Sequence, residues 1–497
     1  MANSPTTAES GSTTSLHKGR LGVVGIVFFV IAAAAPMAGM TGAVPVAIVL
    51  GNGAAAPGAY LAVGLTLLLF SVGYATMSQR VTNAGAFFAY IGRGLGSHAG
   101  VASAFVSVLA YVAVQLAVYG FFGQLMAAQV GMLPWWGWSL LGWAVATALS
   151  LASIDVGARV LGVLMLTEVV SLIVLSIAIL ANGGPEGWNF AASFSPEAIL
   201  VGGLTGSAGI AFAFAFASFI GFEATAIYGE ESKDPKKIVP RATYWAVGII
   251  TGLFALTAFA MVTGMGASLS IDKVLELSDG LANPAGVLLG LATQYVGSWL
   301  AVVMGILVLT SLFGALLALQ NSAARYFFAL GRSGVVAPSL GRVNGRGAPG
   351  NASIVTSVIT GAVIAFFAIL QLDPVLNLFY WFSGLAVVAI VLIEILVCIA
   401  VIVYFRNNKG PENIFQTVIA PVLATLGLII GEYLLMSRFG LLAGTVAEGV
   451  DPTTTSWGLS ITGWVLVLLP FVLLVAGWIY SRARTNVNTT LLKDIVS

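Results

Sequence analysis

The sequence has little charge, few histidines and a single cysteine. Of 497 residues, 8% are Asp, Glu, Lys or Arg, two are histidines, and Cys398 is the one cysteine. One cysteine excludes a disulfide framework and a thiolate metal cluster. His17 and His98, both near the ends of predicted membrane spans, leave almost nothing from which to build a metal centre or a catalytic triad. A membrane-embedded enzyme is therefore disfavoured, and we expect no catalytic residue and no resident cofactor.

The chain also lacks a strong charge of either sign. Its formal net charge is +1 and it has no basic block, so it carries no electrostatic footprint for nucleic acid. Apolar residues, in contrast, make up 59% of the chain, and the mean hydropathy is +1.01. This composition indicates a polytopic membrane protein with the lipid bilayer as its partner, and the expected fold class is an all-α integral membrane protein.

Long apolar runs predict about twelve transmembrane helices, since a span needs about 20 residues. The runs fall at 22–50, 57–78, 99–130, 134–152, 158–181, 202–228, 242–268, 296–330, 352–371, 374–405, 414–437 and 457–480. The predicted division of the chain is a disordered cytoplasmic N-terminus (1–20), a core of ten helices (21–405), helices eleven and twelve (406–481) and a cytoplasmic C-terminal tail (482–497).

The basic residues orient this predicted topology. Of the 20 lysines and arginines, all except Lys273 and Arg438 fall on one side of the membrane. By the positive-inside rule that side is the cytoplasm. Both termini of a multi-pass protein of the cell (plasma or inner) membrane are thus expected to be cytoplasmic.

The sixth predicted span is interrupted in its middle. Residues 216–222 read FASFIGF and are followed by Glu223, an acid that costs roughly 2.5–3.5 kcal/mol at bilayer depth and must face protein or water. At Gly221 a helix can open without steric penalty, and opened backbone at this depth survives only where it lines a cavity. The alternative is a glycine that allows close helix packing beside a buried structural acid.

The first span carries a similar interruption. Residues 34–42 read AAPMAGMTG, and Pro36 removes a backbone donor and opposes a continuous helix. Interrupted apolar segments at corresponding positions of two halves point to the midplane site of a secondary transporter. We predict non-helical backbone within Pro36–Gly42 and within Phe216–Phe222, with spans one to five and six to ten forming inverted repeats.

Three motifs resemble a known superfamily. The GFE of residues 221–223 with EESKDPKKIVPRA at 230–242, the segment 79–96 and the segment 325–349 are similar to the sixth helix and cytoplasmic loops of the amino acid, polyamine and organocation (APC) transporters. The resemblance covers about residues 22–404. It implies a leucine-transporter-like fold, with a 5+5 inverted repeat, broken helices 1 and 6, and two additional C-terminal helices.

The implied function is a secondary active transporter that imports an amino acid or a small, polyamine-type amine by alternating access. An amino acid/amine exchanger is the alternative within this class. From other classes, a channel is disfavoured because no rings of charge repeat along the chain.

The substrate is expected between the two breaks. Half-helix ends expose unpaired N–H and C=O groups, which match the carboxylate and ammonium of an amino acid. In the resembled superfamily the third span flanks the substrate, although its hydroxyl-bearing ridge also suits simple helix–helix contact. The predicted substrate-binding residues are Pro36, Met37, Ala38, Gly39, Met40, Thr41, Tyr111, Gln115, Phe216, Ala217, Ser218, Phe219 and Ile220.

One departure from the superfamily pattern concerns the gate. A superfamily member carries an aromatic gate residue directly before the Ser-Phe-Ile-Gly run. This sequence has Ala217 there and Phe216 one residue earlier. The sequence therefore leaves the identity of the gate open.

The coupling ion stays open between a proton and sodium. Removal from water disfavours the charged form of Glu223, so this acid is a candidate proton carrier, with a permanent structural acceptor as its alternative. Glu168 is the one ionisable residue inside span five, near the place where some proton-driven relatives carry a lysine. Thr310 and Ser311 resemble the hydroxyls of a sodium site, the one metal site considered. Two further membrane acids, Glu394 and Glu432, are expected to pair with hydroxyls or to stay protonated.

Overall fold

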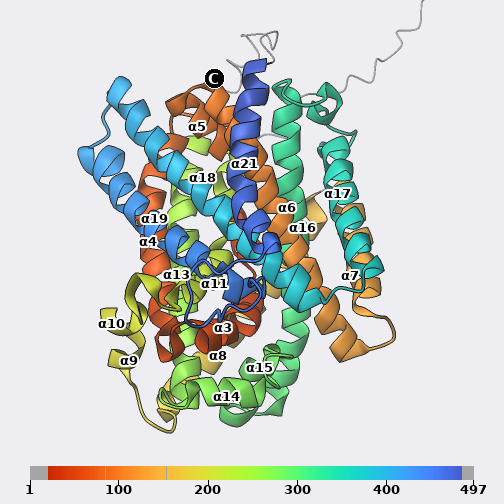
Figure 1. Ribbon diagram of the computed structural model, residues 1–497. Coiled ribbons are helices and arrows are strands. Elements are labelled where there is room, and N and C mark those ends of the chain that lie inside the picture. The colour runs from red at the N-terminus through yellow and green to blue at the C-terminus, as the bar shows by residue number, and fades with distance from the viewer. Residues whose placement is uncertain (1–18, 20, 84, 153, 484–497) are drawn as a thin grey trace, which may run out of the picture.

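The computed structural model describes residue 19 and residues 21–83, 85–152 and 154–483 (Figure 1). The predictions made for the N-terminal segment 1–20 and the tail 482–497 fall almost entirely outside these residues. In the described part the chain forms helices and no β-strand, apart from isolated bridges between Leu21 and Ser232 and between Val446 and Leu459. The all-α fold class is thereby confirmed.

The α-helices have the following bounds: α1 (Val23–Ala34), α2 (Pro36–Ala38), α3 (Val44–Val46), α4 (Ala56–Ser78), α5 (Phe87–Leu95), α6 (Ser97–Val130), α7 (Trp135–Leu151), α8 (Ile154–Asn182), α9 (Phe190–Phe194), α10 (Pro196–Ile199), α11 (Ala208–Phe219), α12 (Ala224–Ile227), α13 (Pro235–Met265), α14 (Ser270–Leu277), α15 (Ala285–Tyr295), α16 (Ser298–Arg332), α17 (Gly350–Ile369), α18 (Tyr380–Asn407), α19 (Ala420–Ser437), α20 (Phe439–Ala443) and α21 (Ile461–Ala483). Among the residues described, four π-helical segments occur at Gly39–Ala43, Ala47–Asn52, Pro374–Phe379 and Phe415–Ile419.

Among the described residues, ten helical stretches are long and apolar enough to cross a membrane. One of them, Val23–Ser78, contains the first two predicted spans, and α7, with 17 residues, coincides with the fourth. The total of twelve spans and the inverted repeat stay predictions. In Figure 1 we call the end of the bundle that carries α5 and the last turn of α21 the upper end. The end that carries α14 and α15 is the lower end.

The first break lies one residue before the predicted segment. Helix α1 ends at Ala34, and Ala35 has φ 44° and ψ 68°, so the chain turns out of the right-handed helix there. A proline ring disfavours helical backbone at the preceding residue, whereas its own fixed φ suits the first position of a helix. Pro36 therefore starts the second half-helix, and the prediction of non-helical backbone within Pro36–Gly42 was wrong by one residue. The π-helical segment Gly39–Ala43 follows instead.

The second break falls within the predicted segment. Helix α11 ends at Phe219, Ile220 has φ −54° and ψ 129°, and Gly221 has φ 115° before α12 begins at Ala224. A Cβ atom at Gly221 would lie 2.6 Å from Cβ of Ala33. Both the positive φ and the close approach of the two chains require glycine here. The second break thus packs directly against the last turn of α1.

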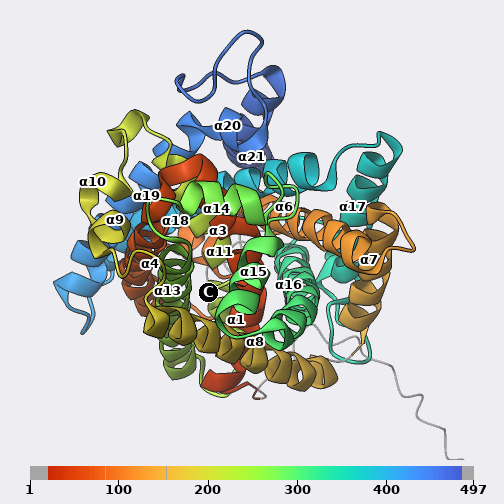
Figure 2. The ribbon, with the colours of Figure 1, turned by 90° about the horizontal axis from the view of Figure 1, so that it is seen from below.

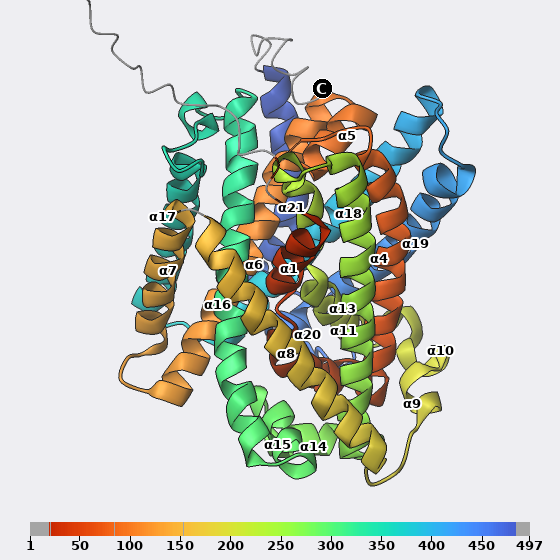
Figure 3. The ribbon, with the colours of Figure 1, turned by 180° about the vertical axis from the view of Figure 1, so that it is seen from behind.

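The broken helices lie against each other in opposite directions. Helix α11 packs on the Ala47–Asn52 segment, and α12 packs on α1. Around them α4 pairs with α13, α6 packs on α16 and α18, and α8 crosses obliquely over α1 and α13 (Figures 2 and 3). The breaks are therefore enclosed near the middle of the bundle.

The upper end is closed by backbone pairing and by two ion pairs. The Leu21 N–H donates to the Glu231 carbonyl at 3.2 Å, and the Lys233 N–H donates to the Leu21 carbonyl at 3.0 Å. Arg325 of α16 pairs with Glu231 at 2.8 Å, and Arg332 pairs with Glu230 at 2.6 Å. These contacts tie the start of α1 to the segment after α12 and to α16.

Candidate functional site

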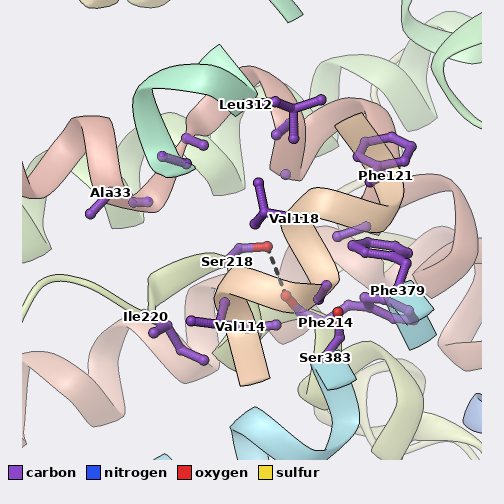
Figure 4. Close-up of a pocket in the computed structure, with 18 residues that line it drawn as sticks. Ala33, Val114, Val118, Phe121, Phe214, Ser218, Ile220, Leu312, Phe379 and Ser383 are labelled. Atoms are coloured by element: carbon purple, nitrogen blue, oxygen red, sulfur yellow. Dashed lines mark hydrogen bonds between the residues drawn. The ribbon is translucent and has the colours of Figure 1, made fainter. Parts of the chain in front are cut away.

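A cavity of about 70 Å³ lies between the two breaks (Figure 4). It is lined by Ala33, Ala34, Ala35, Ala38, Gly39, Ala43, Val114, Ala117, Val118, Phe121, Phe214, Ala217, Ser218, Ile220, Leu312, Ala315, Phe379 and Ser383. None of these described lining residues is charged, and the only side-chain polar atoms among them are the hydroxyls of Ser218 and Ser383. At roughly 10–15 Å³ for one water, the cavity has room for about five water molecules. It fits a small, largely apolar solute.

The backbone at the first break carries unused hydrogen-bonding capacity. Pro36 has no N–H for the Ala32 carbonyl, and the Met37 N–H donates to Oε1 of Glu168 instead of to the Ala33 carbonyl. The C-terminal carbonyls of α1 thus lose their usual intrahelical donors, and such carbonyls carry a partial negative charge.

The end of α11 is similar. The Ile220 N–H donates to the Ala217 carbonyl at 3.2 Å, and the Phe222 N–H donates to the Phe219 carbonyl at 3.3 Å. This tighter last turn bypasses the carbonyls of Phe216 and Ser218, which a continuous α-helix would have used. Carbonyl groups from both broken helices therefore end near the cavity.

Five of the eleven predicted substrate residues in the breaks line the cavity: Ala38, Gly39, Ala217, Ser218 and Ile220. The other six, which are Pro36, Met37, Met40, Thr41, Phe216 and Phe219, are not among its lining residues. For example, the Thr41 hydroxyl donates to the Met37 carbonyl at 2.8 Å. The ring of Phe216 packs on α19, 2.5 Å from where a Cβ of Gly431 would lie.

The two residues predicted in the third span do not line the cavity. The Tyr111 hydroxyl donates to Oε1 of Glu223 at 2.6 Å, and Nε2 of Gln115 donates to Oε1 of Gln320 at 2.7 Å. The residues of α6 that reach the cavity lie further along the helix, at Val114, Ala117, Val118 and Phe121. The third span thus flanks the cavity, but with its apolar side chains.

An aromatic group on the lower side of the cavity was missed by the sequence analysis. The rings of Phe121 and Phe379 stack with centroids 5.0 Å apart, and Phe214 lies 6.4 Å from Phe379. Residues 212–217 read FAFAFA, so three candidate aromatics alternate with alanines. The phenylalanine of this run that lines the cavity is Phe214, whereas Phe216, the aromatic residue one position before the expected gate position, packs on α19.

Leu312 and Ala315 of α16 and Ser383 of α18 also line the cavity and were not predicted. Leu312 directly follows Ser311, so the hydroxyl pair Thr310-Ser311 lies on a helix that lines the cavity and close to the level of the cavity. Ser383 carries no sequence signal, because a lone serine in an apolar span is common.

Glu223 is fully buried and anchored to the second break. Its Oε2 accepts the Gly221 N–H at 2.9 Å, its Oε1 accepts the Tyr111 hydroxyl, and its own carbonyl accepts the Tyr74 hydroxyl at 2.6 Å. The acid thus satisfies the backbone donor that the break frees. Any movement of the second break moves this carboxyl group.

Glu168 occupies the equivalent place at the first break. Its Oε1 accepts both the Met37 N–H and the Ser311 hydroxyl, the latter at 2.8 Å. The neighbouring Thr310 turns away and donates to the Leu307 carbonyl at 3.0 Å. Three of the four predicted coupling residues therefore contact a break directly or through one hydrogen bond, and Thr310 does not. Within the described residues, no group of three or more His, Cys, Asp and Glu side chains could hold a metal ion.

Two broken, antiparallel helices that enclose a central cavity inside a bundle of apolar helices define a multi-pass membrane transporter. Residues 25–489 match the family described as amino acid permease, and the chain belongs to that family. Its place among amino acid transporters is thereby shown, and the resemblance drawn from the GFE segment is confirmed.

Among the curated relatives, the branched-chain amino acid permease BcaP of Lactococcus lactis subsp. cremoris is 29% identical over 280 residues. That match covers 54% of this chain and 53% of the relative, about half of each. An uncharacterized transporter of Mycobacterium tuberculosis (strain ATCC 25618 / H37Rv) is 27% identical over 413 residues, covering 74% of this chain and 78% of the relative. The cationic amino acid transporter 7, chloroplastic, of Arabidopsis thaliana is 30% identical over 167 residues, or 33% of this chain and 26% of the relative.

Proposed function

We propose that this protein imports a small, neutral amino acid across the cell membrane as a proton-coupled secondary transporter. The observation that carries the proposal is the cavity enclosed by the breaks at Ala35 and Gly221. Freed backbone groups at such breaks recognise what all amino acids share, the ammonium and carboxylate groups. The lining side chains then select among amino acids by size and polarity.

The lining favours a small apolar side chain. Ala33, Ala34 and Ala38 on one side and Ala217 on the other leave room for little more than a few carbon atoms. A polyamine or a cationic amino acid carries a second positive charge, and the described lining offers no carboxylate to pair with it. The relative named as a branched-chain permease agrees with an apolar selectivity.

Alternating access gives the two ends of the bundle different roles. By the positive-inside rule, the upper end, where Arg325 and Arg332 are paired, faces the cytoplasm. The lower end has a depression of about 590 Å³ whose lining includes Asp373 and Tyr380. Phe379, next to Tyr380 in sequence, lines the cavity. We propose that the rings of Phe121, Phe214 and Phe379 separate the depression from the cavity and part when substrate enters from outside.

We assign the coupling proton to Glu223, with Glu168 as the second candidate. Each acid accepts a backbone N–H freed by a break, so a change of its charge alters what holds that break in place. A sodium site on Ser311 is less favoured, because its hydroxyl already donates to Glu168 and Thr310 faces elsewhere.

The test is uptake of labelled amino acids by purified protein in proteoliposomes. We expect Gly39→Leu and Ser218→Trp to abolish uptake, because both side chains would fill the cavity. A Cβ at Gly39 already lies 3.3 Å from the Ser218 hydroxyl oxygen. The matched control is Gly248→Leu on α13, where an added Cβ meets no atom within 4 Å. Normal uptake by both cavity variants would reject the site.

The same liposomes distinguish the coupling modes. Accumulation driven by an inward proton gradient in sodium-free buffer supports the proposal, and a strict need for a sodium gradient contradicts it. Labelled exchange without net uptake would identify an exchanger. Glu223→Gln keeps size but cannot titrate, so we expect it to retain exchange and to lose pH-driven accumulation. Undiminished pH-driven accumulation in this variant would move the coupling role to Glu168.

A further inference from the structure

Two acids inside the bundle take no part in the site described so far. Glu394 of α18 is 2% exposed and Glu432 of α19 is 8% exposed. Within the described part of the chain, neither carboxylate oxygen of Glu432 has a hydrogen-bond partner, and Oε2 of Glu394 has none either. A structural acid that joins helices needs a donor to accept from. The expected hydroxyl partners are not found at these three atoms, so a purely structural role has little support.

The two acids lie close together on facing helices. Helices α18 and α19 pack along one another, with the side chains of Cys398 and Thr425 near each other across the contact, and the Thr425 hydroxyl donates to the Pro421 carbonyl at 2.7 Å. Glu394 is four residues before Cys398, and Glu432 is seven residues after Thr425. Because the two helices run in opposite directions, both acids lie toward the lower end from the neighbouring Cys398 and Thr425, separated along the axis by roughly 4–5 Å. Glu432 is the nearer of the two to the lower end.

The pair connects to the second break. Glu394 interacts electrostatically with both Glu432 and Glu223. Helix α19 also packs on α11 just before the break, where Phe216 meets Gly431, the residue next to Glu432. Glu432, Glu394 and Glu223 therefore form a series of acids that leads from the lower half of α19 to the break.

The surroundings suit protons and do not suit metal ions. The titratable groups that act on Glu394 are Glu223 and Glu432, Glu394 in turn acts on Cys398 of its own helix, and the hydroxyls of Tyr74 and Tyr111 lie at Glu223. An isolated charge at this depth is costly, and two neighbouring carboxylates disfavour each other's ionisation. A charge on one acid therefore disfavours a charge on its neighbour, which suits the passage of one proton at a time. The described residues bring no three potential metal ligands together.

We propose that Glu432 and Glu394 form a relay that carries the coupling proton between the lower end and Glu223. In each step the O–H bond of one carboxylic acid breaks and an O–H bond forms on the next carboxylate. The donor is left ionised until it is refilled from the outside, so charge and protons balance. The proposal rests on the proton-coupled transport proposed above, and it adds the route by which the proton reaches the break.

The experiment uses the full-length protein in proteoliposomes that enclose a pH-sensitive dye, with the membrane potential clamped. Exchange of labelled amino acid at equal pH reports the transport cycle alone. Accumulation under an inside-alkaline gradient, with substrate-induced acidification of the lumen, reports coupling. For Glu394→Gln and Glu432→Gln we expect exchange close to that of the unmodified protein, with gradient-driven accumulation and acidification lowered about tenfold or more. The control is Glu448→Gln, an exposed acid in the segment before α21, which should change neither reading.

A second measurement detects the protonated carboxyl groups directly. Compared with the unmodified protein, the infrared difference spectrum of each of the two Gln variants should lack one band of a protonated carboxyl group. The spectrum of Glu448→Gln should lack none. Glu394→Asp, which stays ionisable, should recover part of the accumulation that Glu394→Gln loses, whereas a packing role would make the shorter side chain worse. Full gradient-driven accumulation in both Gln variants would overturn the relay. If the unmodified protein exchanges amino acid but shows no pH-driven accumulation, the relay is also overturned, while amino acid transport stands. If the unmodified protein exchanges no amino acid at all, the transport proposal itself is rejected.

Discussion

Gly221 combines a backbone angle and a contact that no other residue type can satisfy. We expect Gly221→Ala to destabilise the protein by at least about 1–3 kcal/mol, because a residue with a side chain is strained at φ 115°. The crowding against Ala33 adds to this cost. Gly252→Ala on α13, where the added Cβ meets nothing within 4 Å, should instead stabilise by about 0.5–1 kcal/mol. Melting curves of the purified variants decide this, and equal melting of Gly221→Ala and the unmodified protein would contradict it.

Tyr111 acts through an acid rather than through the cavity. Removing its hydroxyl in Tyr111→Phe takes a donor from the buried carboxyl of Glu223, at a cost of about 1–3 kcal/mol. We expect a lower melting temperature and a change in pH-driven accumulation, with little change in the preference among amino acids. Tyr244→Phe, at a partly exposed tyrosine on α13, is the control. A changed substrate preference would place Tyr111 at the substrate instead.

At the scale of elements, the two breaks show how far the sequence could predict this site. The glycine break was located correctly because Gly221 is itself the residue with unusual backbone. The proline break was misplaced because a proline acts on the residue before it, so the turn falls at Ala35 while Pro36 begins a helix. A rule that names the residue before the proline would have found it.

The helix faces could not be predicted in the same way. Polar residues of the third span were expected at the substrate, but Tyr111 and Gln115 satisfy Glu223 and Gln320 in the bundle instead. In an apolar bundle, polar side chains seek each other, and the substrate is left with small and aromatic ones. Only the packing of α6 against α16 and α18 determines which face that is.

The loop between α8 and α9 gives a prediction with a defined pH dependence. Glu186 accepts hydrogen bonds from the Ser268 hydroxyl and from the Ser268 N–H, the latter at 3.1 Å, and these bonds hold the pKa of Glu186 below its ordinary value. A lowered pKa in the folded state means that the stabilisation is present at neutral pH and is lost as the pH falls through that pKa. Glu186→Gln should thus melt earlier than the unmodified protein at pH 7.

The two proteins should melt together well below about pH 4, where both side chains are uncharged. Glu448→Gln, at an exposed acid, should show no such difference at either pH. If the melting temperatures of Glu186→Gln and the unmodified protein still differ in acid, the effect comes from the shape of the side chain rather than from its charge.

At the scale of the whole molecule, two ion pairs of the described chain, Arg325–Glu231 and Arg80–Glu412, differ in burial and therefore in expected strength. The Arg325 side chain is 1% exposed and its partner Glu231 is 10% exposed, so Glu231→Ala leaves a buried, unbalanced guanidinium at a cost of about 3–5 kcal/mol. Glu412→Ala removes the pair with Arg80, which is 37% exposed, and should cost about 1 kcal/mol or less.

The functional consequence is a shift between the two access states. We expect Glu231→Ala to open the upper end, so that a cysteine introduced at Ala38 in a Cys398→Ala background reacts faster with a thiol reagent added from that side. The Glu412→Ala variant should react at the unmodified rate. Equal reactivity of the two variants would show that the Arg325–Glu231 pair does not hold this end closed.

The pairing of Leu21 with the segment after α12 also orders events during synthesis. The Met37 N–H finds its acceptor in Glu168 only 131 residues later, and Leu21 finds Lys233 about 210 residues later. At roughly 5–20 residues per second, that last interval is on the order of 10–40 s. The first broken helix therefore enters the bilayer before the partners of its opened backbone exist. The speed of translation up to Lys233 sets how long the first broken helix remains in lipid without this full set of partners.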